Sequence, residues 1–198
     1  MMLKNATIYF GYGSNLWLQQ MNQRCPTSEY LGIGRLEGYR WMINERGYAN
    51  VVKISEQADI LPGSNITITN VSYGLVYTLQ SKDEDALDIN EGVPVAYEKD
   101  YFRTDFWPVR KDGRPIDVRD EPEKLDNMLV YINRKQVTDS KPKEEYIYRM
   151  NMGIKDAVKQ GIPQAYVDKT MRPFIPEGDY DNVRNVAEQQ ALAFKNGR

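Results

Sequence analysis

The sequence predicts an α+β domain in which strands dominate the first half and helices the last third. β-branched and aromatic runs fill the first half, and amphipathic helical spacing appears from Lys143 onward. Strands and helices do not alternate regularly, which argues against βαβ units. The 198 residues, with 41% hydrophobic and 27% charged side chains, fit one globular domain. These patterns alone leave an open sheet and a small barrel as alternatives.

Strands are expected where β-branched and aromatic residues gather. The first covers Thr7–Tyr12, whose sequence is typical of a buried strand. The segment Asn65–Leu79 is either two strands or one strand that bends at Gly74. The remaining strands are expected at Tyr39–Asn44, Ala49–Lys53, Tyr97–Val109 and Met128–Asn133.

Helices are expected where apolar residues recur at helical spacing, in the segments Leu16–Arg24, Ser81–Asn90, Lys143–Gln160 and Asp181–Phe194. Either Ser14 or Asn15 is expected to be the N-cap of the first helix. The capping-box pattern Ser81-Lys82-Asp83-Glu84 opens the second helix. Gly92 stands where a C′ glycine would end it.

The composition narrows the chemistry that the chain can perform. There is no histidine, and Cys25 is the single cysteine. Ser-His-Asp and Cys-His nucleophile systems are therefore excluded as usually built. Zinc sites need Cys or His ligands, so no metal site is expected. Acid/base work would fall to Asp, Glu, Lys, Tyr or a chain terminus. Cys25 itself is interpreted as a structural or incidental thiol.

Charge and hydropathy bear on partners and location. The formal net charge is −2, so no basic field exists to attract nucleic acid. No run reaches the ~18 apolar residues that a membrane span requires. The start, Met1–Asn5, leads straight into a strand pattern rather than into the apolar region of a signal peptide. We therefore expect a cytoplasmic protein without a nucleic-acid or membrane partner.

The junction of the first strand and helix, Tyr12-Gly13-Ser14-Asn15-Leu16, is the first candidate site. A glycine there lets the backbone approach a ligand closely. The N–H groups of the new helix can bind a carboxylate or a developing oxyanion. A tight turn followed by a good N-cap explains the same residues without any function.

Two further segments carry candidate residues. Glu91 stands at the C-terminal end of a predicted helix, where the helix dipole should disfavour its ionised form. That would move its pKa toward the range useful for proton transfer near neutrality. The alternative is a solvated helix that ends in a turn. Tyr146 begins the second segment, which closes with Gly161-Ile162-Pro163, and its alternative is an apolar core stripe and a helix breaker.

Together these motifs resemble the γ-glutamylcyclotransferase family, which also includes plant AIG2-like proteins. The segment from Tyr9 to Leu16 resembles its N-terminal substrate loop, and Leu31-Gly32 with Leu36–Arg40 resembles its next block. The segment Gly74–Tyr77, followed by Leu87–Val93, resembles the strand and helix that lead to the catalytic glutamate. Tyr146, with Gly153 and then Gly161-Ile162-Pro163, resembles the C-terminal tyrosine segment. Three motifs in the right order are more specific than one.

The resemblance implies a mixed sheet that closes into a small β-barrel with flanking helices, a homodimer and no cofactor. The substrate would be a small γ-glutamyl compound, and the product 5-oxoproline. Glu91 would take a proton from the substrate's α-amine, which attacks the γ-carbonyl, and would then return a proton to the leaving amine. Tyr146 would hydrogen-bond the glutamyl group. The substrate loop would hold that group through Tyr9, Phe10, Gly11, Tyr12, Gly13, Ser14 and Asn15.

The Tyr-Gly-Ser-Asn sequence resembles the branch of the family that acts on γ-glutamyl amino acids. Residues 1–175 are expected to form the catalytic domain, and residues 176–198 a helical tail packed on it. The charged insertion Lys111–Glu123 and the tail do not map onto the family, and they could cover the pocket and change its acceptor side. The main alternative is a non-catalytic AIG2-like binding protein, and the presence of Glu91 argues against it.

Overall fold

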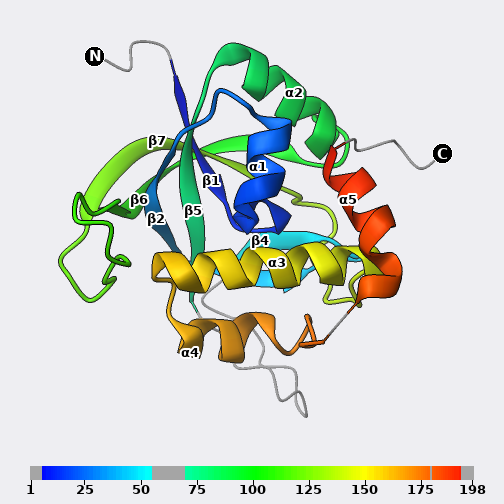
Figure 1. The fold of residues 1–198 in the computed structure, drawn as a ribbon. Coiled ribbons are helices and arrows are strands. Elements are labelled where there is room, and N and C mark those ends of the chain that lie inside the picture. The colour runs from blue at the N-terminus through cyan, green and yellow to red at the C-terminus, as the bar shows by residue number, and fades with distance from the viewer. Residues whose placement is uncertain (1–5, 55–69, 179, 193–198) are drawn as a thin grey trace.

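The computed structural model describes residues 6–54, 70–178 and 180–192 and has a closed five-stranded barrel at its centre (Figure 1). The strands follow the order β1-β5-β2-β6-β7 around the barrel. They are β1 (Thr7–Gly11), β2 (Tyr30–Glu37), β5 (Val71–Leu79), β6 (Glu98–Pro108) and β7 (Glu123–Ile132). Neighbours are antiparallel except β1 and β7, whose parallel pairing closes the barrel. The predicted α+β fold with a mixed barrel is therefore confirmed.

A separate two-stranded hairpin stands beside the barrel. It is formed by β3 (Tyr39–Ile43) and β4 (Ala49–Lys53), which pair antiparallel. The turn between them is closed by hydrogen bonds between Asn44 and Tyr48 and from the Gly47 N–H to the Asn44 carbonyl. Gly47 has φ of +82°, a conformation that glycine adopts without strain.

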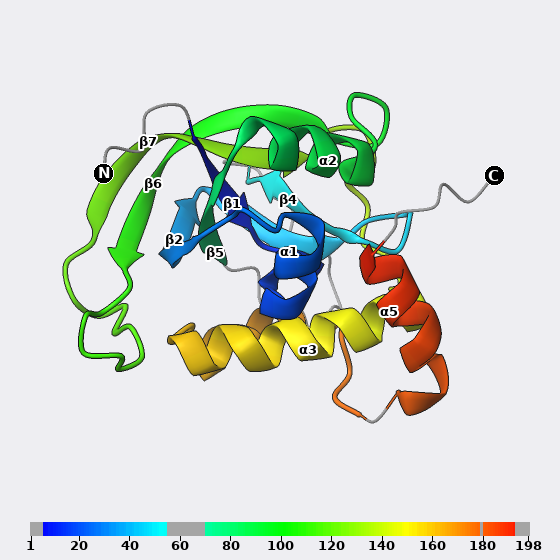
Figure 2. The ribbon, with the colours of Figure 1, turned by 45° about the horizontal axis from the view of Figure 1, so that its top comes forward.

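The helices flank the barrel in an order that both views show. In Figures 1 and 2, α1 lies between α2 and α3, and α5 stands beside the N-terminal end of α3. Their bounds are α1 (Leu18–Arg24), α2 (Ser81–Glu91), α3 (Glu144–Gln160), α4 (Gln164–Tyr166) and α5 (Arg184–Leu192). Short turns of other helix types cover Ser14–Leu16, Val167–Met171 and Asp181–Val183. Within the described ranges, no helix is both long and apolar enough to span a membrane.

Strand β2 was not among the expected strands, and its two glycines disfavour that conformation. The structure explains why one of them is there. A Cβ at Gly34 would lie 2.9 Å from the Phe10 ring, and a Cβ at Gly74 of β5 would lie 2.8 Å from the same ring. The fully buried Phe10 therefore occupies space inside the barrel that side chains at these two positions would fill.

Both predicted N-caps are wrong. The residue that precedes α1 is Trp17, and the one that precedes α2 is Gln80; neither makes a side-chain capping bond. In α2 the acidic residues of the proposed capping box bind elsewhere: Asp83 accepts from Thr27, and Glu84 accepts from Thr7 at 2.5 Å. These two carboxylates bind residues from other parts of the fold instead of capping the start of α2.

Other boundaries differ less. Strand β5 runs unbroken through Gly74, and the expected residues 65–69 of that strand lie outside the described residues. Strand β7 begins at Glu123, five residues before the expected Met128. The expected helix Asp181–Phe194 appears as a short turn followed by α5, and Phe194 lies outside the described residues.

Candidate active site

A cavity of ≈ 50 Å³ opens where the ends of β1 and α2 meet the start of α3. That volume holds about three or four waters, or one compact polar group. Seven of the nine residues predicted from the sequence line it: Tyr9, Tyr12, Gly13, Ser14, Asn15, Glu91 and Tyr146. The other seven lining residues are Arg24, Tyr48, Ala49, Asn90, Tyr97, Tyr131 and Arg149.

Phe10 and Gly11 do not line the cavity. The Phe10 side chain points into the barrel, where it is completely buried. Gly11 pairs with Leu75 at the end of β1. Alternation along a strand sends neighbouring side chains to opposite faces, which separates Phe10 from Tyr9 and explains this placement.

Glu91 is the last residue of α2, and Gly92 ends the helix with φ of +66° as expected. Part of the Glu91 residue stays exposed, but its carboxyl group is surrounded by protein atoms. Burial raises the pKa of Glu91, against the opposing charges of Arg24, Arg149 and Arg46. The direction agrees with the sequence-based expectation, and burial, which the sequence did not reveal, is a cause of the raised pKa.

Asn15 is the neighbour of Glu91 across the cavity. Its side-chain Nδ2 donates to Tyr9 Oη at 2.8 Å and to Glu91 Oε1 at 3.4 Å. Its Oδ1 accepts from Gln20 Nε2 at 2.7 Å and from Arg24 Nη1 at 3.2 Å. Because two donors face Oδ1, the amide can point only its NH₂ group toward Tyr9 and Glu91.

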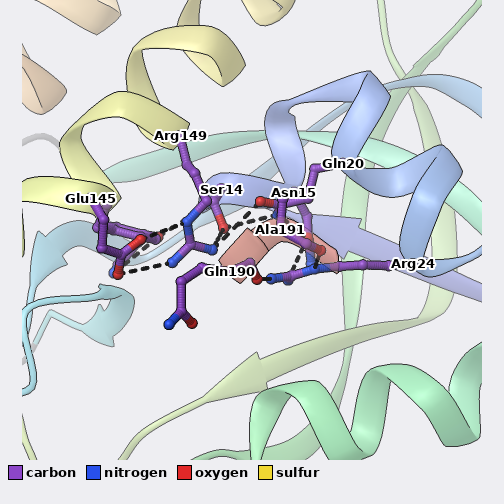
Figure 3. Close-up of polar contacts among 10 residues, drawn as sticks. Ser14, Asn15, Gln20, Arg24, Glu145, Arg149, Gln190 and Ala191 are labelled. Atoms are coloured by element: carbon purple, nitrogen blue, oxygen red, sulfur yellow. Dashed lines mark hydrogen bonds and ion pairs between the residues drawn. The ribbon is translucent and has the colours of Figure 1, made fainter. Parts of the chain in front are cut away.

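Two buried arginines hold the loop that carries Ser14 and Asn15, one from each side (Figure 3). Arg149 of α3 makes a two-pronged ion pair with Glu145 and donates to Ser14 Oγ at 3.2 Å. Arg24 donates to Asn15 and also to the carbonyl oxygens of Ala191 and Gln190, at 2.7 and 3.0 Å. These carbonyls belong to the last turn of α5, where a cation is favoured. The C-terminal helix is thereby tied to the cavity wall.

Tyr146 is buried at the base of the same loop. Its hydroxyl oxygen accepts from the backbone N–H groups of Ser14 and Ala49, each at 3.2 Å. With two donors on its oxygen, the hydroxyl keeps only its own hydrogen to offer to a ligand. A Cβ at Gly13 would lie 2.8 Å from this hydroxyl, so the close approach requires glycine. Burial raises the pKa of Tyr146 to about 12, so it remains a donor at neutral pH.

Most other tyrosine hydroxyls around the cavity are committed to protein acceptors. Tyr97 donates to Ala49 O at 2.8 Å, Tyr12 donates to Tyr131 O at 2.5 Å, and Tyr131 donates to Asp88 at 2.6 Å. Tyr9 differs, because its oxygen accepts from Asn15 and no acceptor for its own hydrogen is found among the described residues. Burial raises the pKa of Tyr9 well above its usual value, so it too is a neutral donor.

The first helical N–H groups are less open to a ligand than the sequence implied. The Leu18 N–H, at the start of α1, donates to Asp156 of α3 at 2.9 Å. The Ser14 N–H is taken by Tyr146. Within residues 6–54, 70–178 and 180–192, the N–H groups of Gly13 and Asn15 have no acceptor. The loop before α1, rather than the end of α1, therefore offers donors to an anion.

Cys25 lies away from this chemistry. Its thiol is completely buried and points to the Asp83 carbonyl at 3.7 Å. Burial raises the pKa of Cys25 to about 12, which disfavours the thiolate that a nucleophile needs.

Sequence reasoning did not find Arg24, Arg149, Tyr97 or Tyr131. One signal was available for Arg149, since it interrupts the apolar stripe of α3 between Tyr146 and Met150. A buried arginine at such a position needs polar partners, which marks it as part of a polar site.

Comparison with solved structures shows that this fold is already known. No family model and no curated protein matches the sequence. Among solved structures, a γ-glutamyl cyclotransferase is similar with a TM-score of 0.62 and 17% identity, over 93% of this chain and 99% of that one. An uncharacterised protein from Homo sapiens is similar with a TM-score of 0.62 and 16% identity, over 93% of this chain and 99% of that one. YkqA from Bacillus subtilis is similar with a TM-score of 0.61 and 16% identity, over 88% of this chain and 57% of YkqA.

At this identity the likeness is one of fold. The chain has the fold of a γ-glutamyl cyclotransferase, as the sequence motifs predicted.

Proposed function

We propose that this chain is a γ-glutamylcyclotransferase that releases 5-oxoproline from a γ-glutamyl amino acid or a related conjugate. The α-amine of the glutamyl group attacks its own γ-carbonyl carbon and closes a five-membered lactam. The bond from that carbon to the leaving nitrogen breaks. Because the nucleophile belongs to the substrate, the protein needs only to orient the glutamyl group and transfer protons.

Glu91 carries the proposal. It is a carboxyl group in a small polar cavity, and burial raises its pKa. A carboxylate of raised pKa is a stronger base than an exposed one. Glu91 takes the proton from the attacking amine and delivers it to the leaving nitrogen, so it ends the cycle as it began.

The groups around Glu91 suit the two ends of a glutamyl chain. The N–H groups of Gly13 and Asn15 are available for the α-carboxylate. Most other polar groups of the cavity are already hydrogen-bonded within the protein, whereas the hydroxyls of Tyr146 and Tyr9 can still donate. Either hydroxyl can donate to the γ-carbonyl oxygen and stabilise the negative charge that develops there.

The direct test incubates the purified chain with a γ-glutamyl dipeptide and follows 5-oxoproline and the freed amino acid together. Cyclisation yields the two products in equal amounts. Hydrolysis would yield glutamate instead of 5-oxoproline. Binding of the dipeptide without turnover, measured by calorimetry, would favour the alternative of a non-catalytic binding protein.

A further inference from the structure

Three arginines act through their charge on Glu91: Arg24, Arg149 and Arg46. The guanidinium groups of Arg24 and Arg149 are engaged with protein carbonyls, amides, hydroxyls and a carboxylate. Arg46 is different. Its Nη1 is buried and makes no hydrogen bond among the described residues, and no carboxylate of those residues forms an ion pair with it. A buried charged donor without an acceptor is costly, so this nitrogen calls for an anionic partner.

The position of Arg46 is set by the β3–β4 turn. Its own N–H donates to Asn44 Oδ1 at 3.0 Å, within the tight turn that Gly47 completes. The guanidinium carbon lies 5.7 Å from the centre of the Tyr48 ring and 5.9 Å from that of Tyr97. Both rings line the cavity, so cation–π contacts hold the guanidinium next to the cavity, although Arg46 is not itself a lining residue.

We propose that Arg46 selects the leaving group by binding a carboxylate on the amine that the reaction releases. This inference rests on the proposed function. The glutamyl half of the substrate already has partners in the free N–H groups of Gly13 and Asn15 and in the hydroxyls of Tyr9 and Tyr146. Arg46 belongs to a different element, the hairpin turn, and its two ring contacts place it beside these groups rather than among them.

The chemistry of the pairing defines a substrate class. Guanidinium and carboxylate form charge-assisted hydrogen bonds, often two at once. A γ-glutamyl α-amino acid carries such a carboxylate next to the leaving nitrogen, and the matching carboxamide or simple alkylamide does not. The chain should therefore prefer γ-glutamyl amino acids to γ-glutamyl compounds whose leaving amine is uncharged.

Lys143 provides a matched control. Its ammonium lies 4.9 Å from the centre of the same Tyr48 ring, but the residue is exposed. Replacing Lys143 removes a positive charge near the same ring and leaves Arg46 unchanged. Lys143→Met and Arg46→Met thus separate a general loss of positive charge from the loss of a specific partner.

The experiment measures kcat/KM for γ-glutamyl-alanine and for γ-glutamyl-alaninamide in the wild type and three variants. Charged hydrogen bonds of this kind correspond to a preference of about 10- to 100-fold for the carboxylate in the wild type. Arg46→Met should reduce that preference to less than about threefold, mainly through the carboxylate substrate. Arg46→Lys should keep an intermediate preference, because it retains charge but not the planar fork. Lys143→Met should leave the ratio unchanged.

Two outcomes would overturn the role of Arg46. An unchanged ratio in Arg46→Met would do so, and so would an equal loss for both substrates, which would place Arg46 on the glutamyl half or on Glu91. Inhibition by 5-oxoproline, which contains only the glutamyl half, should be the same in the wild type and Arg46→Met. If neither substrate yields 5-oxoproline, the proposed function fails. Binding of the two compounds, measured by calorimetry in the wild type and Arg46→Met, then still tests the carboxylate preference.

Discussion

The Asn15 side chain donates to the Glu91 carboxylate over 3.4 Å, and the same amide is fixed in orientation by Gln20 and Arg24. This contact links the loop after β1 to the end of α2, which are 76 residues apart in the chain. It favours the ionised form of Glu91 and so partly offsets the effect of burial on the pKa of that carboxyl.

Asn15→Ala should therefore raise the pKa of Glu91 further. A hydrogen bond to a charged group is worth ~1.5–3 kcal/mol, and because this one is long at 3.4 Å we expect the lower end, roughly tenfold in kcat/KM at neutral pH. The acidic limb of the kcat/KM profile should also move to higher pH. The measurement is that profile for the wild type and the variant, and a limb that moves to lower pH would contradict the assignment.

Tyr146→Phe should lower both activity and stability. It removes the hydrogen that the hydroxyl offers to the cavity, and it leaves the N–H groups of Ser14 and Ala49 without an acceptor. We expect kcat/KM to fall by the equivalent of ~0.5–3 kcal/mol and unfolding free energy to fall by ~1–3 kcal/mol.

Tyr30→Phe is the control for Tyr146→Phe. The Tyr30 hydroxyl is buried outside the cavity and has no hydrogen-bond partner among the described residues. Its removal should leave kcat/KM unchanged and stability equal or higher. Urea unfolding and kinetics on the two variants give the comparison, and equal kinetics in both would remove Tyr146 from the site.

Arg24→Met should disturb the cavity through the C-terminal helix. Arg24 joins Asn15 to the carbonyls of Ala191 and Gln190, so the change frees one end of α5 and one side of the Asn15 amide. Hydrogen bonds to charged groups contribute ~1.5–3 kcal/mol each, so unfolding free energy should fall by at least that much. The pH profile of kcat/KM should shift upward, because the loss of a nearby cation raises the pKa of Glu91.

Glu188→Gln tests whether any change in α5 has the same effect. Arg184 pairs with Glu188 on the exposed face of α5. Such pairs are worth ~0.3–0.5 kcal/mol, so both stability and the pH profile should barely change. A similar shift of the profile in both variants would contradict a specific role for Arg24.

Glu91 should also make stability depend on pH. Because burial raises its pKa in the folded state, the folded chain binds more protons than the unfolded chain between the two pKa values. The contribution of Glu91 to stability is full below its unfolded pKa of ~4.3 and is lost as pH rises through the folded pKa. Relative to the wild type, Glu91→Gln should thus gain stability as pH rises through that window. Urea unfolding at a series of pH values measures the difference, and a difference that is flat or falls with pH would contradict a raised pKa.

Local signals explain which parts of this structure the sequence predicted. Strands β1, β3 and β4 and helix α3 follow from patterns within each segment, and the end of α2 follows from one glycine, Gly92. Strand β2 was missed because Gly34 is explained only by the Phe10 ring that packs against it from another strand.

The network around the cavity depends on contacts between distant segments. Arg149 reaches Ser14 across 135 positions, and Arg24 reaches Ala191 across 167. No periodicity or spacing carries such information. The same limit applies to Glu91, whose position at a helix end could be predicted, whereas the burial that raises its pKa is a property of the assembled fold.

The most direct measurement is the rate of 5-oxoproline release by Glu91→Gln. Glutamine keeps the size and polarity of the side chain but cannot accept the proton, so the chain should fold while the reaction fails. General acid–base catalysis is typically worth about 10²–10⁴-fold, and the upper end is expected because Glu91 would act twice in the proposed mechanism. Glu121→Gln, which changes an exposed carboxylate, is the control and should keep full activity. A folded Glu91→Gln chain that releases 5-oxoproline within tenfold of the wild type would contradict the account.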